Sequence, residues 1–269
     1  MSPEPVPFSK YDEMGAYHWA ECDRNSPRYN PPLEARYTVV SRRIERAKLM
    51  LDVGCGDCYL MGRVRMLCDQ VVGIDTEATG TRLASEKLRP FTNCATVQAS
   101  CYHLPFQTEQ FEIVTLADVI EHLESPAACL EEITRVLRPD GALLLTTPKW
   151  RPDRKWDPRH VKEYTPDELA ESLRPYFSRV TMSYFWPIRW SRMYSTRIGW
   201  RVIRLFARHA YNPFLEEGLD PDCYGQILAV CEEPRREITH SGQVQDSKEC
   251  VARAQGTERG AEATTPAGE

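Results

Sequence analysis

The most specific part of the sequence is Leu49-Met50-Leu51-Asp52-Val53-Gly54-Cys55-Gly56-Asp57. It begins as an apolar run without alternation, which is typical of a strand buried on both faces of a parallel sheet. An acidic residue and a Gly-x-Gly turn follow, and glycines there let the backbone turn sharply and come close to a ligand. The stretch therefore predicts a buried strand that ends in a ligand-binding turn, although an ordinary strand–helix turn would look similar.

A second apolar strand, Gln70–Ile74, ends in Asp75. A carboxylate at the tip of the second strand is well placed to accept both hydroxyls of a ribose. The dinucleotide fingerprint G-x-G-x-x-G is not completed, because Tyr59 stands where its third glycine would be. The pair of features therefore favours a nucleoside cofactor and disfavours NAD.

Short apolar runs alternate with segments of helical period or length along the chain, a pattern that implies a mostly parallel sheet. The sequence predicts a doubly wound α/β fold with a seven-stranded sheet. The expected strands are Leu49–Val53, Gln70–Ile74, Ala95–Gln98, Phe111–Leu116, Ala142–Thr146, Ser178–Phe185 and Gln226–Cys231.

Two helix starts carry their own chemistry. Ser125-Pro126 predicts a hydroxyl cap and a proline at the first helical position, with the helix ending at Pro139-Asp140-Gly141. Thr165-Pro166-Asp167-Glu168 predicts a capping box that opens a helix ending near Leu173.

Composition narrows the class of protein. Of 269 residues, 42% are hydrophobic and 27% charged, and the net charge of −5 argues against a general nucleic-acid binder. No apolar run reaches the ~18 residues that span a membrane, and the first ten residues do not look like a secretory signal. The ten cysteines are scattered, which favours reduced thiols in a cytosolic enzyme.

The ordered motifs resemble the class I S-adenosylmethionine-dependent methyltransferases, in the subfamily that includes ubiquinone-biosynthesis methyltransferases. Asp52, Gly54 and Gly56 match the first motif, and Asp75 matches the ribose-binding acid. The other matching stretches are Ser100–Phe106 beside the adenine, Phe111–Val114, Glu121–Leu123 and Arg135–Gly141. The resemblance implies a Rossmann-like fold and a cofactor held by Asp52, Gly54, Gly56, Asp75, Ser100 and Cys101.

Two positions depart from the family pattern. Cys58 replaces the usual third glycine of the first motif, and Ser100 replaces the usual acid at the adenine amino group. Both departures leave cofactor binding in place but are expected to lower affinity. They also keep open a catalytically silent relative that binds the cofactor or a partner.

A second resemblance concerns chemistry at the methyl group. Asp118, Glu121, His122 and His160 look like the E-x-x-E-H…H arrangement that binds a divalent metal in small-RNA 2′-O-methyltransferases. A related E-x-x-E-H site binds Mg²⁺ in ubiquinone-type O-methyltransferases. Such an ion would lower the pKa of an acceptor hydroxyl. The alternatives are a helix-start acid with a packed histidine, or His122 as a general base without metal.

Two elements outside the sheet are candidates for holding the acceptor. Tyr11–Trp19 is expected to form a helical lid, or simply to pack on the sheet. Segment 187–211 has six arginines and no acid, with Arg197, Arg201, Arg204 and Arg208 at helical spacing beside the apolar stripe Tyr194, Ile198, Val202 and Leu205. This pattern fits peripheral contact with an anionic membrane or a lipid-linked acceptor; the alternative is a solvated helix face.

The sequence therefore predicts an N-terminal extension (1–35), a methyltransferase domain (36–232) with a helical insertion (187–222) before the last strand, and a disordered tail (233–269). The predicted activity is methyl transfer to a small-molecule or lipid-linked acceptor, with an O-methyl product preferred. RNA 2′-O-methylation remains an alternative, against which the acidic charge balance counts. The expected location is the cytoplasm, free or at a membrane surface.

Overall fold

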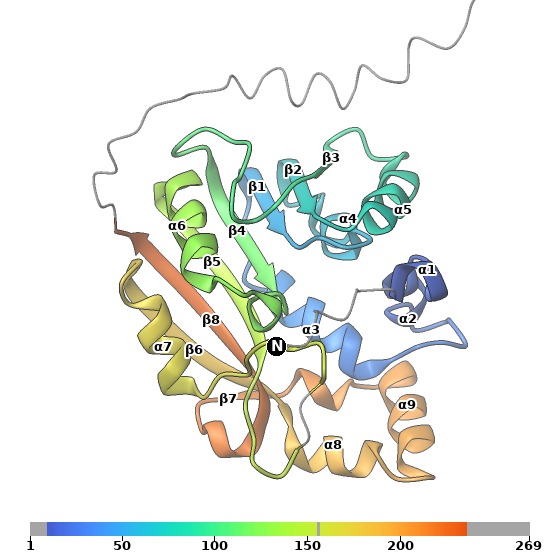
Figure 1. Cartoon of the computed structure of the whole chain (residues 1–269). Coiled ribbons are helices and arrows are strands. Elements are labelled where there is room, and N and C mark those ends of the chain that lie inside the picture. Colours follow the sequence, from blue (N-terminus) through green and yellow to red (C-terminus); the bar gives the residue numbers. More distant parts are fainter. Residues whose placement is uncertain (1–9, 155–156, 236–269) are drawn as a thin grey trace, which may run out of the picture.

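A computed structural model describes residues 10–154 and 157–235, so the N-terminal nine residues and the predicted tail beyond Arg235 lie outside it. The described residues form one mixed sheet of eight strands in the order β3-β2-β1-β4-β5-β8-β6-β7 (Figure 1). The strands are β1 (Ala47–Val53), β2 (Cys68–Asp75), β3 (Cys94–Gln98), β4 (Phe111–Ala117), β5 (Leu137–Pro148), β6 (Phe177–Pro187), β7 (Glu217–Gly218) and β8 (Tyr224–Pro234).

Strands β1 to β5 pair in parallel, whereas β8 lies antiparallel between β5 and β6. Strand β1 is central and pairs with β2 on one side and β4 on the other, so the order of the strands reverses at β1. In open α/β sheets, ligands bind beyond the carboxyl ends of the strands at such a switch point. The glycine turn follows β1 directly and therefore lies at that point.

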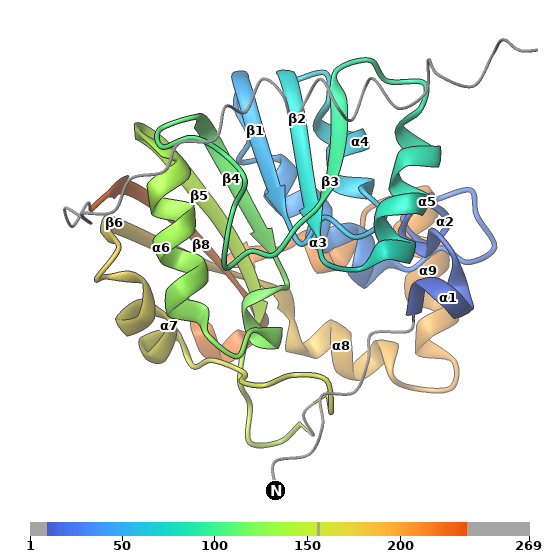
Figure 2. The same cartoon turned by 45° about the horizontal axis from the view of Figure 1, so that its top comes forward.

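Helices cover both faces of the sheet, which is clearest in the tilted view of Figure 2. One buried core lies between the sheet and α6 (Pro126–Val136) and α7 (Pro166–Leu173). The other lies against α3 (Pro31–Ser41), α4 (Tyr59–Val64), α5 (Ala78–Leu88) and α9 (Gly199–His209). Because both faces are buried, the central strands need no alternation of polar residues.

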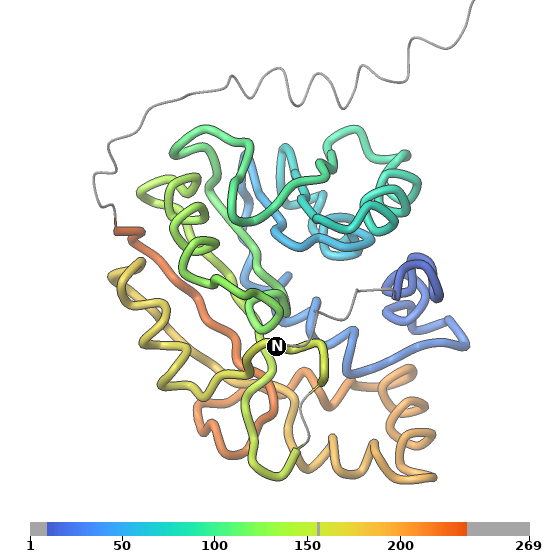
Figure 3. Tube along the Cα trace, viewed as in Figure 1, coloured from blue at the N-terminus to red at the C-terminus, as the bar shows by residue number. Residues whose placement is uncertain are grey.

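The N-terminal segment and the insertion before the last strand lie side by side (Figure 3). The N-terminal segment consists of α1 (Lys10–Met14), α2 (Tyr17–Glu21) and α3, and the insertion contains α8 (Ile188–Tyr194) and α9. Buried Asn212 joins them, since its amide donates to the Pro31 carbonyl and to Glu34 Oε2, both at 2.8 Å. Two segments distant in sequence thus form one layer beside the sheet.

All seven expected strands are present, and three details differ from the sequence analysis. The sheet has an eighth strand, β7, whose two residues pair with the edge of β6. Helix α6 ends at Val136, before Pro139, because the chain from Leu137 already continues as β5. The Ser125 side chain makes no capping hydrogen bond in the described structure; instead, the Tyr102 hydroxyl accepts from the Glu124 and Ser125 amides.

The capping box of α7 is confirmed. The Thr165 hydroxyl accepts from the Glu168 amide at 3.2 Å, and the Glu168 carboxylate accepts from the Thr165 amide at 2.9 Å. Two donors at the helix start are thereby satisfied by side chains.

Candidate cofactor and acceptor site

The glycine turn after β1 needs glycine at two positions. Gly54 and Gly56 have φ values of +73° and +53°, in the left-handed region that favours glycine. A Cβ on Gly54 would lie 2.4 Å from Val119 Cγ2, and one on Gly56 would lie 1.8 Å from the Tyr11 hydroxyl. The amides of Gly54 and Cys55 both donate to the Ile74 carbonyl, at 2.8 and 2.9 Å, which fixes the turn to the end of β2.

Asp75 lies at the end of β2 against this turn. Its Oδ2 accepts from the Gly56 amide at 2.8 Å, and its Oδ1 accepts from the Glu77 amide at 2.9 Å. Burial raises the pKa of Asp75, while backbone donors, first that of Glu77, act in the opposite direction. The carboxylate is thus held in one orientation beside the turn, where it has acceptor capacity for a ribose hydroxyl pair.

Asp52 lies one position before the end of β1 and is 3% exposed. The Thr115 hydroxyl of β4 donates to its Oδ1 at 2.6 Å. Burial raises the pKa of Asp52 to about 7, so the protonated and the ionised carboxyl group coexist near neutral pH. Its described contact supports the junction of β1 and β4 beneath the turn.

Ser100 and Cys101 follow β3 and are half-buried. The Ala99 amide donates to the Asp75 carbonyl at 3.1 Å, so this loop is fixed directly to the acid of β2. Ser100 Oγ accepts from the Tyr102 amide at 3.2 Å. The turn, Asp75 and the Ser100–Cys101 loop thus come together at one edge of the sheet, as the sequence predicts.

Cys58, the departure in the first motif, is fully buried and has φ +58° at the start of α4. Its side chain packs in the core formed with α3, α4 and α5. The left-handed conformation explains why glycine suits this position, and the buried thiol explains how cysteine is accommodated.

Asp118 follows β4 in an unusual left-handed conformation, with φ +54°. It forms an ion pair with Arg36 of α3, and it accepts from the Thr146 hydroxyl at 3.0 Å. Arg36 also lies over the Trp186 ring at 5.5 Å, and its side chain keeps 26% exposure. Sequence analysis missed Arg36, because a lone arginine in an N-terminal helix gives no signal of a partner on β4.

Glu121, His122 and His160 come together, with one ligand atom from each within 4.8 Å of the others. His122 Nδ1 lies 3.0 Å from the Arg159 carbonyl, and His160 Nδ1 lies 2.8 Å from Glu163 Oε1. Because both partners are acceptors, each Nδ1 donates, and the Nε2 atoms are the ring nitrogens that remain to act as ligands. Asp118 does not join this group.

These three residues fit a divalent metal ion. Burial, and next the charge of Asp118, raises the pKa of Glu121 well above its usual range, and its Oε1 is buried without a hydrogen-bond partner among the described residues. Burial lowers the pKa of His122, which favours the neutral imidazole that a ligand or a base requires. Two nitrogen ligands and one oxygen suit a transition metal such as zinc or iron better than Mg²⁺.

The N-terminal segment covers the glycine turn. Asp57 is fully buried; its Oδ2 accepts from the His18 amide at 3.0 Å, and its Oδ1 accepts from His18 Nδ1 at 2.9 Å. Trp19 Nε1 donates to the Asp57 carbonyl at 2.8 Å. The Tyr11 ring lies over both Gly56 and Gly80. Sequence analysis identified these aromatic residues but missed Asp57, the residue that anchors them.

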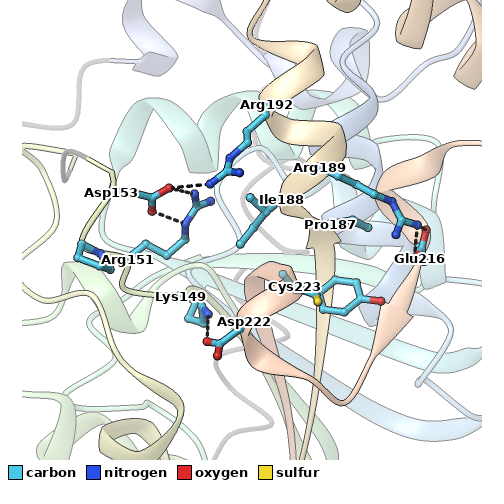
Figure 4. Close-up of a pocket in the computed structure, with 12 residues that line it drawn as sticks. Lys149, Arg151, Asp153, Pro187, Ile188, Arg189, Arg192, Glu216, Asp222 and Cys223 are labelled. Carbon is cyan, nitrogen blue, oxygen red and sulfur yellow. Dashed lines mark hydrogen bonds and ion pairs between the residues drawn. The ribbon is translucent and has the colours of Figure 1, made fainter.

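A separate cavity of about 520 Å³ lies beside the end of β5 and the start of α8 (Figure 4). Its cations are already matched to carboxylates: Arg151 and Arg192 pair with Asp153, Arg189 pairs with Glu216, and Lys149 pairs with Asp222. None of its lining residues belongs to the predicted cofactor set. The cavity therefore offers room near the ends of the strands, with little unbalanced charge.

Comparisons with known proteins agree with this geometry. Residues 51–145 match the family model described as a methyltransferase domain. A probable S-adenosylmethionine-dependent methyltransferase of Mycobacterium tuberculosis is 30% identical over 146 residues, which cover 51% of this chain and 52% of that protein. The chain thus spans about half the length of this relative. A ubiquinone biosynthesis O-methyltransferase of Rhodopseudomonas palustris is 28% identical over 203 residues, covering 64% of this chain and 79% of the relative.

Among solved structures, phosphoethanolamine N-methyltransferase 2 of Haemonchus contortus superposes with a TM-score of 0.62 at 17% identity, covering 85% of this chain and 59% of that one. Strand order, glycine turn and the acid of β2 define a Rossmann-like methyltransferase fold. The chain is thus similar to S-adenosylmethionine-dependent methyltransferases, both in the methyltransferase domain matched by residues 51–145 and in these two relatives.

Proposed function

We propose that this protein transfers the methyl group of S-adenosylmethionine to a hydroxyl group of a small-molecule or lipid-linked acceptor. The observation that carries the proposal is the position of Asp75, whose carboxylate is fixed by the Gly56 and Glu77 amides at the switch point of the sheet. The ribose hydroxyls would bind Asp75, and the adenine would lie along Ser100 and Cys101. The backbone of the turn Gly54–Gly56 would line the cofactor site, and Asp52 would support this turn through its contact with β4.

Arg36 fits the other end of the cofactor. S-Adenosylmethionine carries a carboxylate on its methionine half, and a guanidinium is suited to bind it. The Arg36 side chain retains 26% exposure although it pairs with Asp118. Asp118 in turn offers a carboxylate for the methionine amino group.

The reaction itself requires little covalent help. The acceptor oxygen attacks the methyl carbon, the S–CH3 bond breaks, and its electron pair returns to sulfur, giving S-adenosylhomocysteine. The hydroxyl proton would pass to the Nε2 lone pair of His122. A divalent ion held by Glu121, His122 and His160 would supply an alternative way to lower the pKa of that hydroxyl.

We favour an oxygen acceptor over nitrogen or carbon for two reasons. His122 could act as a base, or with Glu121 and His160 as a metal ligand, and the chain is similar to ubiquinone biosynthesis O-methyltransferases. The same residues would suit an RNA 2′-hydroxyl. The net charge of −5 gives little support for phosphate binding, so RNA methylation is an outcome to be tested rather than our proposal.

Calorimetric titration with S-adenosylhomocysteine tests the cofactor site. We expect Asp75→Ala to weaken binding at least tenfold, while Asp69→Ala, an exposed acid on the same strand, binds like the wild type. NAD should not bind. Equal binding by both variants would refute the assigned site, and absence of binding by folded wild-type protein would refute the proposal.

Turnover is the second part of the test. Release of S-adenosylhomocysteine is measured across hydroxyl acceptors, each beside its O-methylated form, with and without a chelator. Turnover that stops on chelation and returns with a transition metal supports the metal ligands, and unchanged turnover supports His122 acting alone. Tight cofactor binding without turnover on any acceptor would instead indicate a catalytically silent relative.

A further inference from the structure

Helix α9 presents an apolar stripe to solvent. Ile198, Val202, Leu205 and Phe206 are between 50% and 69% exposed. They follow the i, i+4, i+7, i+8 spacing that places side chains on one side of a helix. Single exposed apolar residues are common on protein surfaces, but four on one short helix form a continuous patch.

The opposite side of α9 fastens the helix to the body of the protein. Ile203 is 2% exposed and packs in the core with residues of α3 and α4, and Ala207 is fully buried. Arg208 donates to the Ser26 carbonyl of the N-terminal segment at 2.6 Å. The orientation of the helix is therefore set by its own buried side, and the apolar stripe has no covering element in the described structure.

Arginines flank the exposed stripe. Arg197, Arg201 and Arg204 lie on the edge of the stripe away from Ile203, by the same helical spacing. None of the three forms an ion pair with a carboxylate among the described residues, whereas Arg189 and Arg192 of α8 both do. No Asp or Glu occurs between Pro187 and Leu215, in a chain whose net charge is −5. The outward surface of α9 is thus apolar and cationic at once.

We propose that this surface of α9 docks on an anionic lipid bilayer. Aliphatic and aromatic side chains can enter the boundary between headgroups and acyl chains, while arginines at their edge reach lipid phosphates. No helix in the described part of the chain has the length and apolar character needed to cross a bilayer, so α9 lies on the surface. The proposal is independent of methyl transfer.

The composition of the patch favours lipid over other occupants. A second copy docked through the same patch in a two-fold dimer would bring the arginines of both copies together. A nucleic acid would match the arginines but leave the four apolar side chains without an apolar partner. An anionic bilayer offers acyl chains to the apolar side chains and phosphates to the arginines.

Vesicle sedimentation with the full chain tests the proposal. Wild-type protein should bind vesicles of phosphatidylcholine and phosphatidylglycerol at 3:1 at least tenfold more tightly than phosphatidylcholine alone, and salt should weaken binding. Leu205→Glu should reduce binding at least tenfold. Leu219→Glu is the matched control, because Leu219 is 80% exposed but lies outside α9, and it should bind like the wild type.

The arginines are tested separately. Replacing Arg197, Arg201 and Arg204 together by Gln should abolish the preference for phosphatidylglycerol. Thermal stability should fall only slightly, through the contacts of Arg201 and Arg204 with the Trp200 ring at 5.3 and 5.9 Å. Equal binding by wild type and Leu205→Glu, or absence of binding to both vesicle types, would overturn the proposal. A concentration-dependent dimer that Leu205→Glu disrupts in sedimentation velocity would also overturn it, in favour of a second copy.

Discussion

The N-terminal segment and helix α9 both lie outside the sheet and are rich in apolar and aromatic residues. These residues are buried in the N-terminal segment, whereas several of them are exposed on α9. Tyr11, Tyr17 and His18 are less than 10% exposed, whereas Ile198 and Leu205 are more than 60% exposed. The N-terminal segment has a buried polar anchor, Asp57, that fixes its aromatic rings over the glycine turn. Helix α9 is fixed only by its opposite side.

The difference separates two roles for elements added to one fold. An element whose apolar surface is buried by the protein itself shapes what lies beneath it, here the glycine turn after β1. An element whose apolar surface remains exposed is suited to contact something else. Unfolding measurements on variants of both regions test this distinction.

The largest effect is expected from Asp57→Ala. The change leaves the buried His18 amide and ring nitrogen without their acceptor, so the free energy of unfolding should fall by about 3–5 kcal/mol. Urea unfolding measures it, with Phe206→Ala of α9 as the counterpart; Phe206 is 50% exposed, so its loss should stay within about 0.5 kcal/mol. Similar losses in the two variants would erase the contrast.

The buried carboxyl group of Asp52, near the end of β1, predicts that stability depends on pH. Burial raises the pKa of Asp52 from 3.8 to about 7, so between these values the folded state holds a proton that the unfolded state has released. Stability therefore falls as pH rises through this window, by up to about 1.4 kcal/mol per pH unit and about 2–4 kcal/mol in all. Asn resembles the protonated carboxyl, so Asp52→Asn should remove this slope.

Urea unfolding at pH 5, 6, 7 and 8 measures the slope in both proteins. Asp140→Asn, at an exposed position on β5, is the control and should parallel the wild type. Curves for Asp52→Asn and wild type that run parallel from pH 5 to 8 would show that Asp52 is ionised in the folded state throughout.

How much the sequence could predict follows from how local each feature is. Gly54, Gly56 and Asp75 form their site through the turn after β1 and the end of β2, and a strand pattern places both ends at one edge of the sheet. The pairs Arg36–Asp118 and His18–Asp57 join different elements, and no local pattern encodes them. Asp118 is an example, since its sequence context allows either a metal ligand or a helix-start acid, and the structure pairs it with Arg36.

The orientation of helix α9 is a second feature that the sequence alone could not predict. Periodicity revealed its apolar stripe and its arginines, but it could not tell which side faces the protein, because both Ile203 and Leu205 are apolar. Burial against the residues of α3 and α4 decides the matter, and those residues are far from α9 in sequence.

The last comparison therefore concerns two residues of this one helix. Ile203→Ala removes buried methyl groups and should cost about 2–4 kcal/mol of unfolding free energy, whereas Leu205→Ala, at 63% exposure, should stay within about 0.5 kcal/mol. The same urea titration measures both. A large loss at Leu205 with little at Ile203 would mean that α9 is turned the other way, and equal large losses would mean that both sides are covered. In either case the exposed stripe, and with it the reason for a lipid partner, would disappear.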